Sequence, residues 1–378
     1  MNFDFGPDQY QFQDSVRSFL ADRWNPARLR ALMTGDGFDP VLWQGLTDIG
    51  LPALLVPEEH GGLGLGFVDL ALVLEEFGRA LVPGPLVETM LATDVIARFA
   101  TQAQQAEWLP GIAEGRLRIV PAVTEAEGCD PALMQAAAVE TPQGWVLSGC
   151  KIIVAYAGQA DRLLVAARFG PSGTFGLGLV DPNGPGVTRR PHALFDLAAR
   201  ADEVVFDAAP VEFLGGVPQP DALHRLLDAG AAASALQLTG IAARMLDLAV
   251  EYVGQRVQFG RPIGAFQAIK HRCADMMVQV ETSRTAAYYA AWAMSSGPGE
   301  AAQAVSMAKA YCGDAARFVC NEAIQLHGGI GFAWELDLHL YLRRAKSLEY
   351  AYGDASQHRE RVLALALLAR EALANEAA

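Results

Sequence analysis

Residues 256–267 (RVQFGRPIGAFQ), broken by glycine and proline, gather side chains that suit an anionic, aromatic ligand. The guanidinium of Arg256 presents a planar fork of donors that matches a phosphate group. The ring of Phe259 can stack on another ring, and the amide of Gln267 can hydrogen-bond a diphosphate or an amide edge. Taken alone, such a segment is more often a plain helix–turn–helix that ends at a glycine.

A second segment, residues 325–332 (QLHGGIGF), is suited to approach a phosphate through its backbone. Gly328 and Gly329 carry no Cβ, so their N–H groups can lie close to an anion, and Gln325 adds a side-chain amide. The spacing is not the GxGxxG that follows a strand in a Rossmann fold. His327 could act as an acid, but a histidine at a helix end more often interacts with the helix dipole.

The elements that must position these segments change in type twice along the chain. Residues 1–118 have helical apolar spacing, residues 119–214 have short runs separated by turn residues, and residues 215–378 are helical again. We therefore predict an α+β protein with an N-terminal helical domain, a central antiparallel β-barrel or sandwich, and a C-terminal four-helix bundle. The predicted strands are 118–124, 136–139, 144–148, 151–155, 163–167, 176–180, 187–189 and 203–206. The predicted helices are 8–24, 41–48, 67–78, 85–99, 102–114, 221–255, 265–295 and 300–327, with two more in 336–378 around Tyr352, Gly353 and Asp354.

Composition limits the kinds of partner that the protein can have. Of 378 residues, 52% are hydrophobic and 19% are charged, which favours a folded chain with a large core. A net charge of −14 argues against nucleic acid, whose phosphates select basic surfaces. We expect no membrane insertion, because the most apolar stretches are short, and a cytoplasmic protein, because the N-terminus does not resemble a signal peptide. The five scattered cysteines show no metal-ligand spacing, so we predict reduced thiols and no metal.

Three further motifs precede the two segments in the chain. They are residues 56–64 (VPEEHGGLG), 123–125 (VTE) and 149–155 (GCKIIVA). Together with residues 256–267 and 325–331, they resemble the acyl-CoA dehydrogenase family of flavoproteins. The resemblance runs from about Pro7 to Arg361, and it is specific because five separated motifs agree in order and spacing.

The resemblance implies where FAD would bind. Thr124 and the strand end at Ile153 and Ala155 would contact the flavin, and residues 256–267 and 325–331 would hold the ADP part across a subunit interface. The implied cofactor-binding residues are Thr124, Ile153, Ala155, Arg256, Phe259, Gln267, Gln325, Gly328 and Gly329. The family usually has a tryptophan and a threonine where Ile153 and Ala155 stand, so one hydrogen bond worth about 0.5–1.5 kcal/mol is lost near the ring.

The resemblance also implies a reaction and partners. The family dehydrogenates acyl-CoA thioesters in lipid metabolism: a base removes the α-proton, and the β-hydride passes to the flavin. We therefore expect an acyl-CoA substrate and either a homotetramer or a heterotetramer with a second subunit of this family. An electron-transfer flavoprotein is the expected electron acceptor.

The sequence departs from the family at the catalytic base. In the run YAYGDA, Tyr352 takes the place of the usual glutamate, and the alternative position on an earlier helix falls at Gly230. Asp354, two residues after the usual position, is one possible base, as an aspartate is in the nitroalkane-oxidising branch of the superfamily. Asp228, Glu349 or another acid that reaches the pocket is a second possibility.

A third interpretation is that the chain is one half of a heteromeric enzyme in which a partner subunit supplies the base. Residues 325–335 (QLHGGIGFAWE) and the Gly353-Asp354 pair resemble the bacterial branch that acts on steroid side chains, where two different family members pair. Two other functions are compatible with the same fold. One is a flavoprotein oxidase, and the other is a non-catalytic partner that binds FAD or a CoA thioester.

Overall fold

The chain forms two compact units, each made of segments that are distant in the sequence. The computed structural model describes residues 5–296 and 298–376. One unit contains Met1–Asp22, Phe67–Val82 and Ala231–Ala378, and the other contains Arg23–Gly66 and Pro83–Gly230. The division into residues 1–118, 119–214 and 215–378 follows the type of element instead, and as a division into domains it stays a prediction.

Helices occupy the first third of the chain, and several begin at recognisable caps. They are α1 (Pro7–Arg23), α2 (Pro26–Leu32), α3 (Pro40–Asp48), α4 (Phe67–Ala80), α5 (Leu86–Phe99) and α6 (Gln102–Ala113). The carboxylate of Asp39 caps α3, and Thr101 forms a capping box with Gln104 at the start of α6. The sequence prediction missed the short helix α2, which Asn25 caps and a proline begins.

Within the described residues, the central segment forms one sheet of eight strands. They are β1 (Ile119–Ala122), β2 (Ala137–Thr141), β3 (Gly144–Ala155), β4 (Arg162–Phe169), β5 (Thr174–Val180), β6 (Val187–Pro191), β7 (Ala201–Pro210) and β8 (Glu212–Phe213). Their order is β6-β7-β3-β2-β4-β5-β8, and β1 pairs with β4. β4 pairs in parallel with both β1 and β2, so the sheet is mixed and not purely antiparallel as expected. The runs 144–148 and 151–155, predicted as two strands, form the single strand β3, because Gly149 at φ +145° and a register shift replace a turn.

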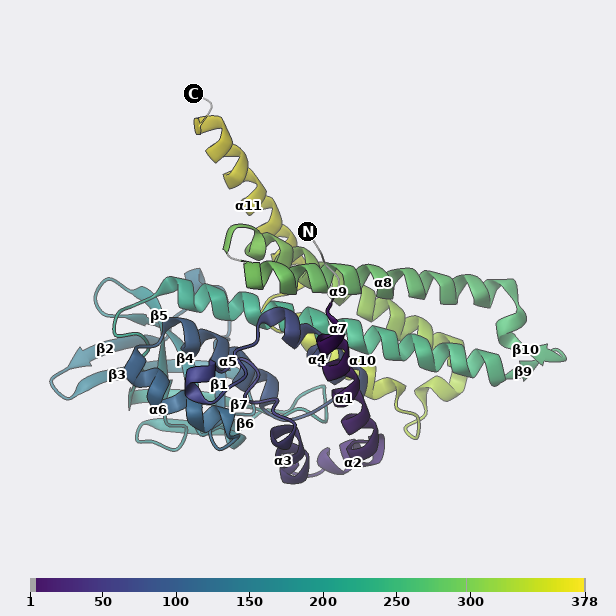
Figure 1. Cartoon of the computed structure of the whole chain (residues 1–378), viewed down its shortest axis with the longest axis horizontal. Coiled ribbons are helices and arrows are strands. Elements are labelled where there is room, and N and C mark those ends of the chain that lie inside the picture. Colours follow the sequence, from purple (N-terminus) through teal and green to yellow (C-terminus); the bar gives the residue numbers. More distant parts are fainter. Residues whose placement is uncertain (1–4, 297, 377–378) are drawn as a thin grey trace. The chain divides into compact units, whose positions relative to one another are not determined.

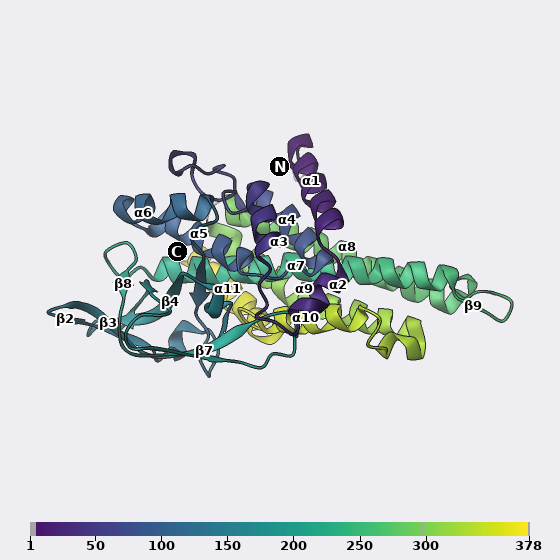
Figure 2. The same cartoon turned by 90° about the horizontal axis from the view of Figure 1, so that it is seen from below.

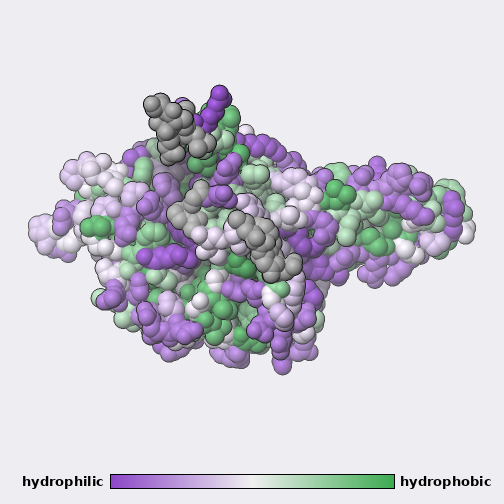
Figure 3. Space-filling model, turned by 45° about the horizontal axis from the view of Figure 1, so that its top comes forward, coloured by the Kyte–Doolittle hydropathy of each residue, from purple (hydrophilic) through white to green (hydrophobic). Residues whose placement is uncertain are grey.

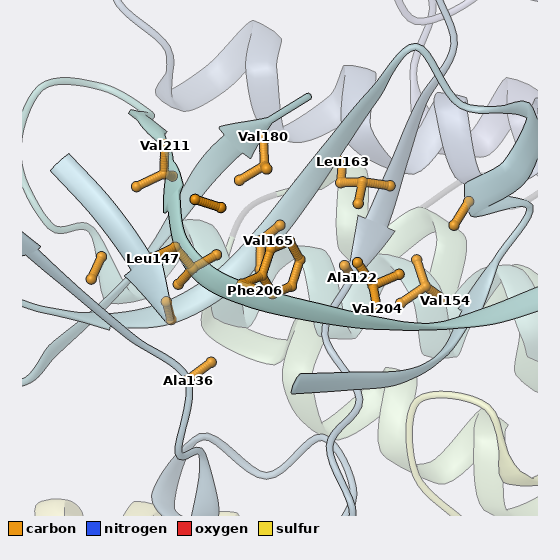
Figure 4. Close-up of a cluster of buried hydrophobic side chains, with 14 of the residues drawn as sticks. Ala122, Ala136, Leu147, Val154, Leu163, Val165, Val180, Val204, Phe206 and Val211 are labelled. Carbon is orange, nitrogen blue, oxygen red and sulfur yellow. The ribbon is translucent and has the colours of Figure 1, made fainter. Parts of the chain in front are cut away.

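The sheet encloses a hydrophobic core (Figure 4). Leu147 on β3 and Phe206 on β7 are at most 2% exposed and belong to this cluster. Side chains alternate along a strand, so inner positions are normally an even number of residues apart. β3 breaks this rule, because Lys151 and Val154 are both buried, and a register shift between them leaves Ile153 exposed.

The last segment is helical, and α9 is its central helix. Its helices are α7 (Pro220–Gln255), α8 (Gln267–Ser296), α9 (Pro298–His327), α10 (Leu338–Tyr350) and α11 (Ala355–Glu376). α8, α10 and α11 all pack against α9. Figures 1 and 2 show α8 and α9 side by side, with the hairpin of β9 (Val257–Gln258) and β10 (Arg261–Pro262) at the end where α7 leads into α8. The bounds predicted for α7, α8 and α9 agree with the observed ones to within two residues.

The helix α7 is long and apolar enough to cross a membrane by length and composition, with a mean hydropathy of 1.3 over its most apolar window. Of that window, 94% is buried inside the protein, as in the core helix of a soluble fold. This helix was predicted from the sequence, but it was not counted as long and apolar enough to span a membrane, because Gln237 and Thr239 interrupt the apolar run. Both side chains are buried, so burial and not composition identifies α7 as a core helix.

Two glycines let α4 and α7 pack at backbone distance. A Cβ on Gly78 would lie 2.0 Å from the carbonyl oxygen of Gln237, and one on Gly240 would lie 2.0 Å from that of Glu75. Packing therefore requires both glycines. The buried carboxylate of Glu75 also accepts a hydrogen bond from Arg284 of α8 at 3.0 Å, so α4 contacts both α7 and α8.

Candidate cofactor site and catalytic loop

The hairpin after α7 has a strained tip. Gln258 pairs with Arg261, which leaves a two-residue turn of Phe259 and Gly260 at φ +54° and +76°. Positive φ at both positions is typical of a type I′ turn, which Asn-Gly normally occupies. A phenylalanine is costly there because its Cβ crowds the backbone, so turn chemistry does not explain Phe259.

The side chains predicted to bind the cofactor in this segment are exposed. The ring of Phe259 is 89% exposed, and Arg256 and Gln267 are exposed as well. The backbone of Arg256 is fixed, because its N–H donates to the Tyr252 carbonyl at 2.9 Å and its carbonyl accepts the Ile263 N–H at 2.8 Å. Among the described residues, the Arg256 guanidinium has no ion-pair partner. The side chain is therefore available to an anion from outside the chain.

The second predicted segment lies beside the first. α9 ends at His327, and a 3-10 turn, η5 (Gly328–Phe332), follows with Gly328 at φ +64°. The His327 ring stacks on the Tyr252 ring with centroids 4.2 Å apart, and its Nδ1 donates to a carbonyl one turn earlier at 2.7 Å. Tyr252 lies one helical turn before Arg256, so this stack brings the ends of α7 and α9 together. His327 is buried and supports this junction.

The end of α9 presents one amide side chain and two glycines to solvent. Gln325, Gly328 and Gly329 are exposed, and a Cβ on either glycine would meet nothing within 4 Å. Packing inside the chain therefore does not require these glycines, although the φ of +64° at Gly328 favours glycine there, and both leave the backbone accessible. Phe332, four residues after Gly328, is 81% exposed. Elsewhere too, on the face drawn in Figure 3, hydrophobic residues lie among hydrophilic ones at the surface.

Thr124, Ile153 and Ala155, which were predicted to contact the flavin, lie on β3 or next to it in the sheet region. The Ile152 N–H donates to the Thr124 carbonyl at 2.9 Å, which joins the segment after β1 to β3. Ile153 has φ +52° and is 47% exposed, which is an outlier for a β-branched residue. Thr124 and Ala155 are half-buried. The structure therefore brings these three residues into one stretch of paired backbone.

A buried ion pair adjoins this stretch. The side chain of Lys151 is completely buried, and its Nζ lies 2.7 Å from Glu125 Oε1 and 3.5 Å from the Val123 carbonyl oxygen. Glu125 also accepts the N–H groups of Gln135 at 2.7 Å and Ala136 at 3.0 Å. Burial by itself would raise the pKa of Glu125, but the hydrogen bond and charge of Lys151, with these two amides, hold that pKa below its ordinary value. Burial lowers the pKa of Lys151, and Glu125 opposes this effect.

The donors on the bundle have the chemistry that a dinucleotide requires. Arg256 carries a permanent charge and planar donors for a phosphate, Gln325 adds an exposed amide, and the exposed backbone of Gly328 and Gly329 has no Cβ to keep an anion away. The exposed ring of Phe259 can stack on a base. The residues present therefore fit FAD. In residues 5–296 and 298–376, no group of three or more His, Cys, Asp or Glu side chains is placed to hold a metal ion.

The loop between α10 and α11 uses Asp354 as a helix cap. Its Oδ1 accepts the Gln357 N–H at 2.9 Å, and Gln357 Oε1 accepts the Asp354 N–H at 3.1 Å. This reciprocal pair is a capping box at the start of α11. Tyr352 has φ +56°, and its carbonyl accepts a hydrogen bond from His358 Nε2 at 3.0 Å. A role for Asp354 as a base would compete with its hydrogen bond to α11.

Three cations surround the start of this loop. The buried Lys309 donates from Nζ to the carbonyls of Glu349 at 2.8 Å and Gly353 at 2.7 Å. The carboxylate of Glu349 pairs with Arg317 and, at 2.7 Å, with Lys346. Glu349 is therefore buried between two positive charges, which suits a structural ion pair better than a free base.

The sequence interpretation missed Lys151 and Lys309. Both are at most 1% exposed, although lysine is almost never buried without a partner. A signal was present, because each stands alone in an apolar run, CKIIVA for Lys151 and MAKAYC for Lys309. A lone cation in a run that predicts a core strand or core helix indicates a buried partner.

Models of the acyl-CoA dehydrogenase family match two parts of the chain. The N-terminal domain of that family matches residues 6–116, and the C-terminal domain matches residues 221–367. These two matches flank the sheet that carries Thr124 and Ile153.

Individual proteins are similar over nearly the whole chain. Acyl-CoA dehydrogenase IpdE2 of Mycobacterium tuberculosis is 35% identical over 342 residues, which cover 90% of this chain and 91% of IpdE2. A variant of the Tcur3481-Tcur3483 steroid ACAD has a structure with 33% identity and a TM-score of 0.89, covering 96% of this chain and 99% of its own. The ChsE4-ChsE5 complex from Mycobacterium tuberculosis gives 28% identity and a TM-score of 0.88, covering 96% and 98%. The FAD complex of PigA, at 24% identity and a TM-score of 0.87 over 96% and 98%, shows a likeness of fold alone.

Proposed function

Because the chain belongs to the acyl-CoA dehydrogenase family, we propose that it takes part in FAD-dependent α,β-dehydrogenation of an acyl-CoA thioester as the base-lacking subunit of a heteromeric enzyme. The observation that carries this proposal is the loop between α10 and α11. Tyr352 stands there at the family's usual base position, and the nearby Asp354 caps a helix.

Bound FAD would supply the acceptor for the hydride that leaves the substrate's β-carbon. Arg256 would bind a phosphate oxygen through charge-assisted hydrogen bonds, and the exposed ring of Phe259 would stack on the adenine. The side chains of Ile153 and Ala155 have no hydroxyl, so these side chains would contact the flavin by packing alone, and Thr124 would add a polar contact. The proposed contacts of the ADP part are Arg256, Phe259, Gln267, Gln325, Gly328 and Gly329.

Proton removal is the step that this chain is least equipped to perform. The α-proton of a thioester is weakly acidic, so its removal needs a carboxylate placed against the carbon in a dry pocket. Neither usual position offers one, because Tyr352 and Gly230 occupy them. Asp354 is hydrogen-bonded to its own helix, and Glu349 is paired with two cations. These contacts support a base that comes from a second subunit.

Two of the similar structures support the pairing of two different chains. One is a complex of ChsE4 with ChsE5, and the other is the steroid ACAD that carries the double name Tcur3481-Tcur3483. The proposed assembly is a heterotetramer with a second member of the family, and a homotetramer is the alternative. An electron-transfer flavoprotein as electron acceptor, a cytoplasmic location and a role in lipid metabolism are parts of the same proposal. They rest on family membership and on the fold of a soluble enzyme.

Anaerobic titration with acyl-CoA thioesters tests the proposal. The chain is purified alone and together with a family member that carries the base glutamate, and the visible absorbance of the flavin is followed. We expect the flavin to bleach only in the paired preparation. If no thioester bleaches either preparation, the dehydrogenase activity is contradicted. Rapid bleaching by the chain alone would contradict the missing base.

The substitution Asp354→Asn separates the cap from the alternative role of Asp354 as a base. Asparagine caps a helix about as well as aspartate, so we expect an unchanged urea midpoint and unchanged bleaching in the paired enzyme. The control Asp354→Ala should lower the free energy of unfolding by about 1 kcal/mol, because the cap is lost. Lost turnover with an unchanged urea midpoint in Asp354→Asn would instead identify Asp354 as the base.

A further inference from the structure

Stability does not account for the buried pair of Lys151 and Glu125. The side chain of Lys151 is 0% exposed and that of Glu125 is 9% exposed. Removing two charges from water is costly, and apolar side chains of similar volume often give equal or greater stability. The presence of the pair therefore needs another explanation, and its contacts with the backbone supply one.

The pair contacts the residues on both sides of Thr124. Nζ of Lys151 lies 3.5 Å from the carbonyl oxygen of Val123 and 2.7 Å from the carboxylate of Glu125. The same carboxylate accepts the N–H groups of residues 135 and 136, which lie just before β2. One network therefore fastens the segment after β1, the start of β2 and the strand β3 to one another.

The same lysine stands next to the irregularity that exposes Ile153. Lys151 and Val154 are both buried, and Val154 appears in the hydrophobic cluster of Figure 4. The register shift between them leaves Ile153 at φ +52° on the surface. The Ile152 N–H donates to the Thr124 carbonyl at 2.9 Å. Thr124 and Ile153 therefore lie in one hydrogen-bonded segment of backbone, and the buried side chain of Lys151 anchors this segment through Val123 and Glu125.

We propose that Lys151 is a positioning residue, which acts through Val123 and Glu125 to hold Thr124 and Ile153 in the orientation that supports the flavin ring. The inference rests on the proposed function, since it takes the ring to bind at Thr124 and Ile153. Lys151 is completely buried, so it acts through its neighbours and not by touching the ring. Displacements of about 1 Å in Thr124 or Ile153 would be enough to disturb the position of a bound flavin ring.

The test compares Lys151→Met with Leu147→Ala in the purified holoenzyme. Leu147 is a matched control, because it is buried on the same strand and its loss leaves a cavity in the same core. The measurements are the FAD dissociation constant, the midpoint potential of the flavin and its visible circular dichroism. We expect Lys151→Met to weaken FAD binding by roughly tenfold and to change the potential and the dichroism. Leu147→Ala should lower stability and leave both flavin signals unchanged.

A double variant separates positioning from stability. Lys151→Met leaves the carboxylate of Glu125 buried without its cation, and adding Glu125→Gln removes that charge. We expect the double variant to regain much of the lost urea midpoint while its flavin potential and dichroism stay altered. If the flavin signals return together with stability, the role of Lys151 is structural support and the proposal is wrong. Wild-type flavin signals in Lys151→Met would overturn it equally.

Hydrogen exchange of the apoprotein keeps this inference distinguishable from the proposed function. Lys151→Met should speed amide exchange at residues 123–125, 135–136 and 151–153 in the absence of any flavin, and Leu147→Ala should not do so selectively. A wild-type chain that never takes up flavin, alone or paired, would refute the proposed function. A flavin-loaded wild type whose Lys151→Met variant exchanges normally would refute the positioning role alone.

Discussion

The two regions proposed to hold the cofactor share one feature and differ in how they support it. Ile153 on β3 has φ +52°, and Phe259 in the β9–β10 hairpin has φ +54°. Beneath Ile153 lies the buried network of Lys151 and Glu125. Phe259 stands at the tip of a hairpin whose strands have two residues each, and residues 257–262 are all exposed.

This difference indicates which region is complete within one chain. A strained backbone persists only where its surroundings over-determine it. For Ile153 the chain itself supplies those surroundings. For Phe259 it supplies the β9–β10 pairing, the hydrogen bonds of Arg256 and one edge contact with the Phe266 ring, and the Phe259 ring stays 89% exposed. We therefore propose that the residues around Ile153 are preformed within one chain and that a bound dinucleotide or a second chain completes the surroundings of Phe259.

The largest effect is expected from Glu125→Gln, which breaks the buried pair. Removing one partner leaves the ammonium of Lys151 buried without its counter-charge, so the free energy of unfolding at neutral pH should fall by about 3–5 kcal/mol, measured with urea. The matched control is Glu203→Gln, because Glu203 pairs with the exposed Arg190 at 2.9 Å in the same sheet. Surface pairs contribute little, so the control should lose less than about 1 kcal/mol. Equal losses of stability in the two variants would show that the buried pair stabilises the sheet around β3 no more than a surface pair does.

The same pair predicts a pH dependence. The pKa of Glu125 is lowered in the folded protein, so its stabilising contribution is present above the ordinary carboxyl pKa and is lost as the pH falls through the folded value. Between about pH 6 and pH 3, the wild type should therefore lose more stability than Glu125→Gln. Parallel pH profiles of the two proteins would contradict the charge-paired state of Glu125.

A smaller effect is expected from Arg256→Ala, in the hairpin region. A charge-assisted contact to phosphate is worth about 1.5–3 kcal/mol, so FAD retention should fall by roughly one to two orders of magnitude. Stability of the apoprotein should not change, because Arg256 is exposed. Arg190→Ala serves as the control for removal of an exposed arginine. Unchanged flavin occupancy in Arg256→Ala would remove Arg256 from the site.

The smallest effect is expected from relief of backbone strain at the two positions. Phe259→Asn suits a type I′ turn and should raise the free energy of unfolding by about 1 kcal/mol, while FAD binding weakens because the ring is lost. Ile153→Gly should give a smaller gain, because glycine loses more conformational entropy on folding. The comparison is between urea midpoints of the two apoproteins. A destabilised Phe259→Asn would show that the ring is packed within the chain.

Most of the fold could be predicted from the sequence, but the buried contacts that support the candidate site could not. Helical spacing located α7, α8 and α9 because their apolar pattern and their glycine and proline breaks are local signals. The continuity of β3 and the parallel pairing of β4 were not predicted, since both depend on partners distant in the sequence. The motif containing Thr124 pointed to a cofactor contact, but the link from Lys151 to Glu125 spans 26 residues. No local pattern specifies such a pairing.

The most direct test of this account is whether flavin binding requires association of chains. Analytical ultracentrifugation of the purified protein, alone and with a family member that carries the base glutamate, would record protein and flavin absorbance in the same run. The account predicts that flavin sediments only with assembled species and that monomers carry none. Stoichiometric flavin on a monomeric chain, or no flavin on any species, would contradict it.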